Sequence, residues 1–139
     1  MNDTYKTFDE ITAEDIKSIL AVDFGRDKSW GLPIIRIDDN SYAVAANEEE
    51  ANQAVAEYIK SYICYFRPSF IAEHSDIPVE IFEALAEKDF DKPDVYLQLI
   101  HDFDDFVNDA IDADGRGHFL NIWDREEYEI DNYLLYRID

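Results

Sequence analysis

The spacing of apolar residues changes twice along this chain of 139 residues. Between residues 47 and 111, apolar side chains recur at intervals of three and four, which is the period of an α-helix. Residues 32–46 and 118–138 instead hold short aromatic and β-branched runs divided by turn residues, which indicate strands. The sequence therefore predicts an α+β fold: a small antiparallel sheet, made of an N-terminal hairpin and a C-terminal meander, packed against several helices.

The N-terminal third predicts a helix followed by a hairpin. Thr12 and Asp15 have the spacing of a capping box, so we expect a helix over residues 13–23, ended by Gly25. Residues 32–46 predict two short strands that are joined by a turn over residues 38–40.

The middle of the chain predicts helices. Asn47 is an N-cap candidate, and the helix that it begins should end near Pro68, with a short helical stretch through Phe70 to follow. Pro78 should open another helix, with Ile81, Phe82 and Leu85 turned inward. The longest helix is expected from Pro93 to Gly115 or Gly117, along one continuous apolar stripe.

The C-terminal part predicts three strands. They cover residues 118–123, 128–130 and 133–138, with acidic turns between them. Middle helices should cover one face of the resulting sheet.

The net charge limits the partners that this chain can bind. It carries 33 acidic and 12 basic residues, a net charge of −21, so direct binding to nucleic acid or to an anionic membrane is not expected. With 47% hydrophobic residues the chain can still bury a core, and its length predicts one domain over residues 1–139. The N-terminus lacks the features of a signal peptide, and Cys64 has no second cysteine to pair with, so we expect a soluble cytoplasmic protein.

The negative charge is concentrated in residues 76–114, which hold 13 acidic and two basic residues. Four aspartates recur there at helical spacing, on the face opposite Phe103, Phe106 and Val107. Their separation of about 4.5–6 Å along a helix axis resembles that of nucleic-acid phosphates. The predicted partner-binding residues are Asp102, Asp105, Asp109 and Asp112, with Asp104, Glu80, Glu83 and Glu87. The alternative is a solvated helix face without a partner.

No motif of an enzyme or a cofactor site is present, so we expect no catalytic residues, no cofactor and no metal. The Asp112-Ala-Asp114-Gly115 segment resembles part of a calcium loop, but the loop pattern would place Ala110 and Asn121 at its two end ligands. A helix end with a glycine cap explains it better. Cys64 should be a buried structural thiol.

A small site near Arg116 and His118 is a weaker alternative. His118 is expected at the start of a strand, and we favour local pairing of Asp114 with Arg116 over a ligand site, because no nucleophile or phosphate loop is near. His101 is expected as an exposed histidine on the long helix.

The segment Asp114-Gly-Arg-Gly-His-Phe-Leu-Asn, followed by Tyr133-Leu-Leu-Tyr-Arg, resembles the ending of small acidic proteins of bacteriophages and mobile elements. The Asn47-Glu-Glu-Glu-Ala stretch is similar to that family too. This resemblance supplies no catalytic residues. It implies a counter-defence context, of the anti-CRISPR or anti-restriction kind, in which proteins often imitate DNA.

Three functions stay open from the sequence. The first is a non-enzymatic inhibitor whose acidic face blocks the groove of a basic nucleic-acid-binding protein. The second is an immunity protein that neutralises a basic nuclease toxin, and the third is a small ligand-binding domain or enzyme. A homodimer is compatible with each of them.

Overall fold

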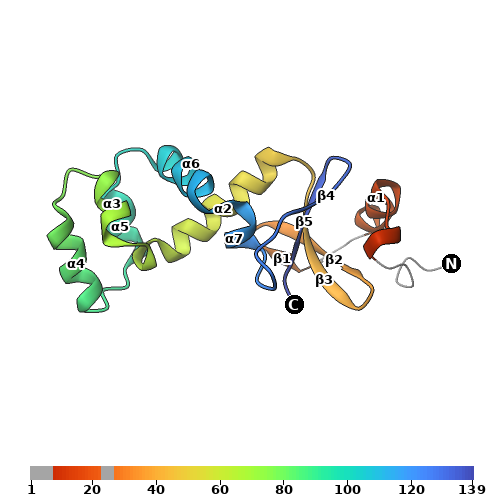
Figure 1. Ribbon diagram of the computed structural model, residues 1–139, viewed down its shortest axis with the longest axis horizontal. Helices are drawn as coiled ribbons and strands as arrows, with labels where there is room; N and C mark the ends of the chain where they lie inside the picture. Colours follow the sequence, from red (N-terminus) through yellow and green to blue (C-terminus); the bar gives the residue numbers. More distant parts are fainter. Residues whose placement is uncertain (1–7, 23–26) are drawn as a thin grey trace. The chain divides into compact units, whose positions relative to one another are not determined.

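The computed structural model describes residues 8–22 and 27–139, so the expected helix end at Gly25 lies outside the described part. The chain divides into two compact units, Met1–Val55 with Asp114–Asp139, and Ala56–Ala113. The first unit holds an antiparallel sheet of five strands, and the second is helical (Figure 1). The predicted α+β fold with a small antiparallel sheet is confirmed; the single domain stays a prediction.

The helices, including two short 3-10 segments, are η2 (Phe8–Glu10), α1 (Ala13–Ala21), α2 (Glu48–Tyr62), η3 (Ile63–Tyr65), α3 (Pro68–Glu73), α4 (Val79–Glu87), α5 (Pro93–Leu99), α6 (Phe103–Asp114) and α7 (Arg116–Leu120). The strands are β1 (Lys28–Ser29), β2 (Leu32–Ile37), β3 (Asn40–Ala45), β4 (Tyr128–Ile130) and β5 (Tyr133–Arg137). No helix within residues 8–22 and 27–139 has the length and apolar character needed to cross a membrane.

The sheet joins the two ends of the sequence in the order β1-β2-β3-β5-β4. The predicted N-terminal hairpin is β2–β3, and its turn residues Asp38 and Asp39 have φ of 51° and 68°. Two positive φ angles define the turn type that suits the twist of a tight hairpin. The short strand β1, which the sequence analysis did not predict, is added through a similar turn at Trp30 and Gly31.

Helix α1 covers one face of this sheet. The predicted capping box is present, because the Asp15 amide donates to Thr12 Oγ1 at 3.2 Å and the Thr12 amide donates to Asp15 Oδ2 at 3.0 Å. Ile16 is completely buried and belongs to one apolar cluster between the helix and the strands. The buried members of this cluster are Ile11, Ile16, Ile35, Ile37, Tyr42, Val44 and Leu135.

Helix α7 contacts β5 and corrects one prediction, because residues 118–120 were expected to begin a strand. Phe119 and Leu120 are buried as expected of core residues, but from a helix. Short apolar runs do not distinguish a buried helix from a strand. The predicted meander is therefore a hairpin of β4 and β5, with β5 paired to β3.

The second unit has an aromatic core of its own. Phe106 lies at its centre, with ring centroids of Phe66, Phe70 and His74 within 4.9–5.3 Å. Cys64 is buried as predicted, and burial raises the pKa of its thiol. Further buried side chains of this unit are Ile59, Ile63, Ile71, Phe82, Tyr96, Val107 and Ala110.

The single long helix expected from Pro93 onward is instead two helices, α5 and α6. Neither of them is the longest helix of the structure. The helix breaks at residues 100–102, where the His101 amide donates to the carbonyl of His74 at 2.9 Å instead of continuing the helix. Asp102 then caps α6, since its Oδ1 accepts from the Asp105 amide at 3.2 Å. A second correction concerns Ile81, which is 50% exposed although it was expected to face inward.

Candidate partner-binding surface

Helix α6, in the second unit, has an exposed acidic face. Phe106, Val107 and Ala110 are buried, and the opposite side of the helix is exposed. The exposed acidic residues of this helix are Asp104, Asp105, Asp109 and Asp112, with Asp114 at its end. Members of the face follow each other at about 4.5–6 Å along the axis. We call Asp102, Asp105, Asp109 and Asp112 the α6 acidic face.

Two members of this face also have structural contacts. Asp102 is exposed but acts as the N-cap of α6, outside the helix rather than within it. Asp109 Oδ2 lies 3.0 Å from Nε2 of His74, whose side chain is only 11% exposed. These two atoms are not aligned for a hydrogen bond. The contact is therefore purely electrostatic, and it is an ion pair only when His74 is protonated. Asp105 and Asp112 are thus the members most available to a partner.

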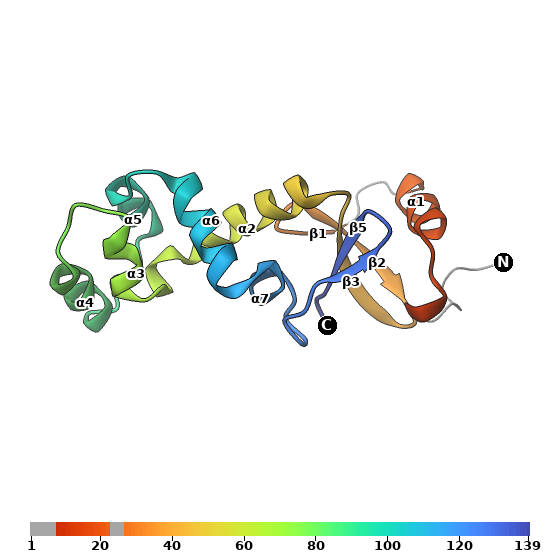
Figure 2. The same ribbon diagram turned by 45° about the horizontal axis from the view of Figure 1, so that its top comes forward.

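The predicted glutamates form a separate cluster. Glu80, Glu83 and Glu87 are all exposed on α4. Helices α3 and α5 lie between α4 and α6 in both ribbon views, so these glutamates belong to a helix that does not neighbour α6 (Figures 1 and 2). The sequence predicted one binding set, and the structure divides it between two helices of the same unit, α4 and α6.

Few positive charges in the second unit offset its acids. Residues 56–113 hold 14 acidic and four basic residues. Lys60 is engaged, since its Nζ lies 3.0 Å from Glu57 Oε2 and 5.8 Å from the centre of the Phe103 ring. His101 Nε2 lies 3.0 Å from Asp76 Oδ1 at the break between α5 and α6. His101 is exposed as expected, although it lies outside a helix.

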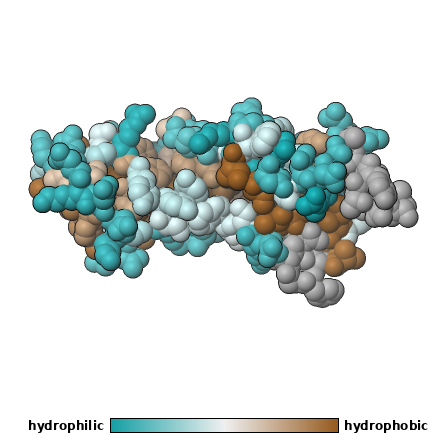
Figure 3. Space-filling view, turned by 90° about the horizontal axis from the view of Figure 1, so that it is seen from below, coloured by the Kyte–Doolittle hydropathy of each residue, from teal (hydrophilic) through white to brown (hydrophobic). Residues whose placement is uncertain are grey.

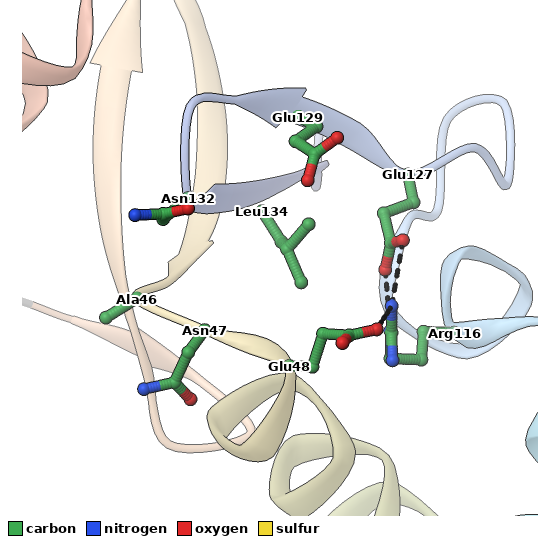
Figure 4. A pocket seen from close by; sticks show the side chains of 8 residues that line it. All are labelled: Ala46, Asn47, Glu48, Arg116, Glu127, Glu129, Asn132 and Leu134. Atoms are coloured by element: carbon green, nitrogen blue, oxygen red, sulfur yellow. Dashed lines mark hydrogen bonds and ion pairs between the residues drawn. The ribbon is translucent and has the colours of Figure 1, made fainter.

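The first unit contains a pocket of about 400 Å³ beside Arg116 (Figure 4). Its lining is mostly polar and includes three glutamates, and His118, which the weaker alternative placed in a site with Arg116, is not part of it. The lining residues are Ala46, Asn47, Glu48, Arg116, Glu127, Glu129, Asn132 and Leu134.

Arg116 makes four hydrogen bonds with other groups of the first unit. Its Nε and Nη2 donate to the two carboxylate oxygens of Glu127 at 2.7 and 3.0 Å. The guanidinium also donates to Glu48 at 3.2 Å and to Asn52 at 3.0 Å. This corrects the expected local pair with Asp114. A two-point arginine–carboxylate contact with further partners fixes α7 to α2 and to the segment before β4.

The pKa shifts of this cluster follow from its contacts. Burial alone would raise the pKa of Glu127, but hydrogen bonds from Arg116 and Tyr136 and the charge of Arg116 lower it overall. The phenol of Tyr136, which donates to Glu127 at 2.5 Å, has its pKa raised by burial and by this bond. The hydrogen bond to Glu127 is also the main reason that the pKa of Arg116 is raised. The cluster is an ion-pair network in which four of the five N–H donors of Arg116 are used within the protein.

Sequence reasoning missed the hydrogen-bond partners of Arg116, and it missed Tyr136, which donates to Glu127. The partners Glu48, Asn52 and Glu127 are 68, 64 and 11 residues away along the chain. A local motif could not reveal them, because only the folded sheet brings these segments together.

Comparisons with protein-family models, with curated proteins and with solved structures found no match to this chain.

Proposed function

We propose that this chain is a non-enzymatic inhibitor that imitates the negative charge of nucleic acid. Its α6 acidic face would occupy the DNA- or RNA-binding groove of a basic protein. The context implied by its resemblance to small phage proteins makes that partner a host defence protein, of a CRISPR or restriction system, in the host cytoplasm. The observation that carries this proposal is an exposed row of carboxylates that no basic residue interrupts between Pro93 and Arg116.

The cost of the row supports a role beyond solubility. Like charges three or four residues apart destabilise a helix by about 0.2–0.5 kcal/mol per pair. Alternating lysines would remove this cost, and residues 94–115 contain none. A basic groove would remove it as well, because cationic side chains would replace the missing counter-charges.

A charge density this high would mainly increase the rate at which the chain associates with a basic protein. Long-range attraction raises the rate at which oppositely charged proteins meet, and it weakens as salt screens it. Binding should therefore be strong at low salt and much weaker at high salt. The imitation needs exposed carboxylates in a fixed row, which the packed core under α6 supplies through Phe106 and Val107.

The test is a pulldown from a lysate of cells in which the chain is naturally expressed, at low and high salt. Wild-type protein is compared with Asp102→Asn/Asp105→Asn/Asp109→Asn/Asp112→Asn, and captured proteins are identified by mass spectrometry. The α4 variant Glu80→Gln/Glu83→Gln/Glu87→Gln is a matched control with three exposed charges removed from another helix of the same unit.

We expect capture of a nucleic-acid-binding protein that is lost in the α6 variant and in high salt, and that competing duplex DNA or RNA displaces. Equal capture by the wild type and the α6 variant would contradict the proposal. If the captured protein is a nuclease toxin encoded beside this chain, the function is immunity instead.

A further inference from the structure

The loop after α7 presents two large apolar side chains to solvent. Ile122 is 71% exposed and Trp123 is 61% exposed. Apolar atoms also reach the surface among hydrophilic side chains in the space-filling view (Figure 3). Single exposed apolar residues are common, but two adjacent ones in a well-organised loop form a patch, and exposed apolar patches rimmed by polar residues mark interaction sites.

Asn121 organises this loop from inside. It is 1% exposed and is the one buried polar residue found in the described part of the chain. Its Oδ1 accepts from the amides of residues 123, 124 and 125 at 2.8, 2.9 and 3.3 Å. Its Nδ2 donates to the carbonyl of Glu126 at 2.9 Å. A single side chain thus satisfies four backbone groups and holds the loop in one conformation.

Neighbouring segments hold the loop from outside. The Ile122 amide donates to the carbonyl of Arg137 at 3.0 Å, which joins the loop to β5. A Cβ atom at Gly117 would lie 2.5 Å from the carbonyl oxygen of Arg125, so only glycine allows α7 to approach this closely. The Arg137 guanidinium lies 3.9 Å from the centre of the Trp123 ring, a stabilising cation–π contact that fixes the ring.

We propose that Ile122 and Trp123 are the apolar anchor of a protein interface, and that they enter an apolar pocket rimmed by basic residues on the partner. Buried tryptophans surrounded by polar contacts dominate the binding energy of many interfaces. A loop that is already rigid loses little conformational entropy on binding. This inference rests on the proposed function for its partner, a basic protein, but it concerns a second contact in the other unit.

The charges around the loop indicate that the rim of the partner's pocket is basic. Two positive side chains lie beside the loop, and each contacts another group of the first unit. The Arg137 guanidinium lies over the Trp123 ring, and Arg125 donates to the carbonyl oxygen of His118 at 3.2 Å. The carboxylates of Asp124 and Glu126 are exposed. The Tyr128 phenol donates to Asp124, and this bond lowers the pKa of the carboxyl, so its charge persists. A basic rim would complement them.

The first experiment places a photo-crosslinking amino acid, p-benzoylphenylalanine, at position 123. The matched control carries it at Val22, which is 74% exposed in the same unit. Both proteins are irradiated in the lysate used for the pulldown, and the crosslinked peptides are identified. We expect position 123 to crosslink to a protein segment rich in Lys and Arg beside apolar residues. No crosslink above the Val22 control, or a crosslink between two copies of this chain, would overturn the inference.

The second experiment measures the affinity of the purified, crosslinked protein for three forms of the chain: wild type, Ile122→Ala/Trp123→Ala, and the α6 variant. Removal of the anchor should weaken binding by about thirtyfold or more, since interface hot spots contribute at least about 2 kcal/mol. Unchanged affinity of the anchor variant with a loss in the α6 variant would refute the anchor and leave mimicry intact. The reverse result would keep the anchor and refute mimicry. Circular dichroism confirms that both variants are folded.

Discussion

The two units use their carboxylates differently. In the first unit, acidic side chains complete the fold: Glu127 holds Arg116 and Tyr136, and Asp124 accepts from Tyr128. In the second unit, the carboxylates of α4 and most of those of α6 face solvent. The net charge of −21 is therefore not one uniform property of the surface. Part of it stabilises the sheet unit, and part of it faces solvent.

The largest effect should come from Arg116→Ala. Side chains of Arg116 and Glu127 are 14% and 29% exposed, and removal of the cation leaves Glu127 without its main partner. We expect a loss of about 1–3 kcal/mol in the free energy of unfolding, because a partly buried carboxylate is left without its charged hydrogen-bond donor. Urea denaturation followed by circular dichroism measures it.

Arg36→Ala is the control for this change. Arg36 lies 4.0 Å from Asp39, with side chains 61% and 99% exposed, and such surface pairs contribute about 0–1 kcal/mol. Equal destabilisation by the two substitutions would show that the Arg116 cluster is no more important to the fold than a surface pair.

Acid should weaken the same cluster. The pKa of Glu127 is lowered in the folded protein, so the carboxylate stabilises the fold above its ordinary pKa of 4.5. This contribution is lost as the pH falls below that value and through the folded pKa. We expect the stability difference between wild type and Glu127→Gln to shrink in that range. Urea denaturation across the pH series measures it.

The Arg116→Ala background is the control for the pH series. Without the cation that lowers the Glu127 pKa, the same Glu127→Gln comparison should depend less on pH. An identical pH dependence in both backgrounds would contradict the assigned role of Arg116.

Local sequence signals predicted most of the fold. The capping box at Thr12, the turn at Asp38 and Asp39, and the hairpin of β4 and β5 each depend on neighbouring residues, and each prediction is confirmed. One error arose where a contact between residues distant in the sequence determines the local structure. The chain breaks at His101 because a carbonyl of residue 74 accepts its amide, and no local pattern announces that bond.

The candidate surfaces were predictable to different degrees. Helical spacing was enough to place Asp105, Asp109 and Asp112 on one exposed face, since the period of a helix is a local property. It could not show that α3 and α5 separate the helix of the α4 glutamates from α6. It also could not show that Ile122 is exposed, because this depends on how Asn121 is buried after folding.

Substitutions at the start of α6 should reduce the stability of the protein less than Arg116→Ala does. Asp102→Ala should cost about 1 kcal/mol, as loss of an N-cap usually does, whereas Asp102→Asn should cost little because asparagine caps equally well. Thermal unfolding of both variants measures the difference. Equal loss in the two variants would mean that the charge of Asp102, and not its cap, stabilises this unit.

The smallest effects should have opposite signs at the two ends of α6. Asp105 lies in the first turn, near the positive end of the helix dipole, and Asp112 lies in the last turn, where no basic residue offsets the negative end. We therefore expect Asp105→Asn to destabilise and Asp112→Asn to stabilise the protein, each by about 0.3–1 kcal/mol at low salt. Urea denaturation at low salt and at about 0.5 M NaCl measures both, and salt should reduce each effect. If instead Asp112→Asn destabilised the protein at both salt concentrations, its carboxylate would have a structural role like that of Glu127, and the contrast between the two units would fail at the position where a partner is expected to bind.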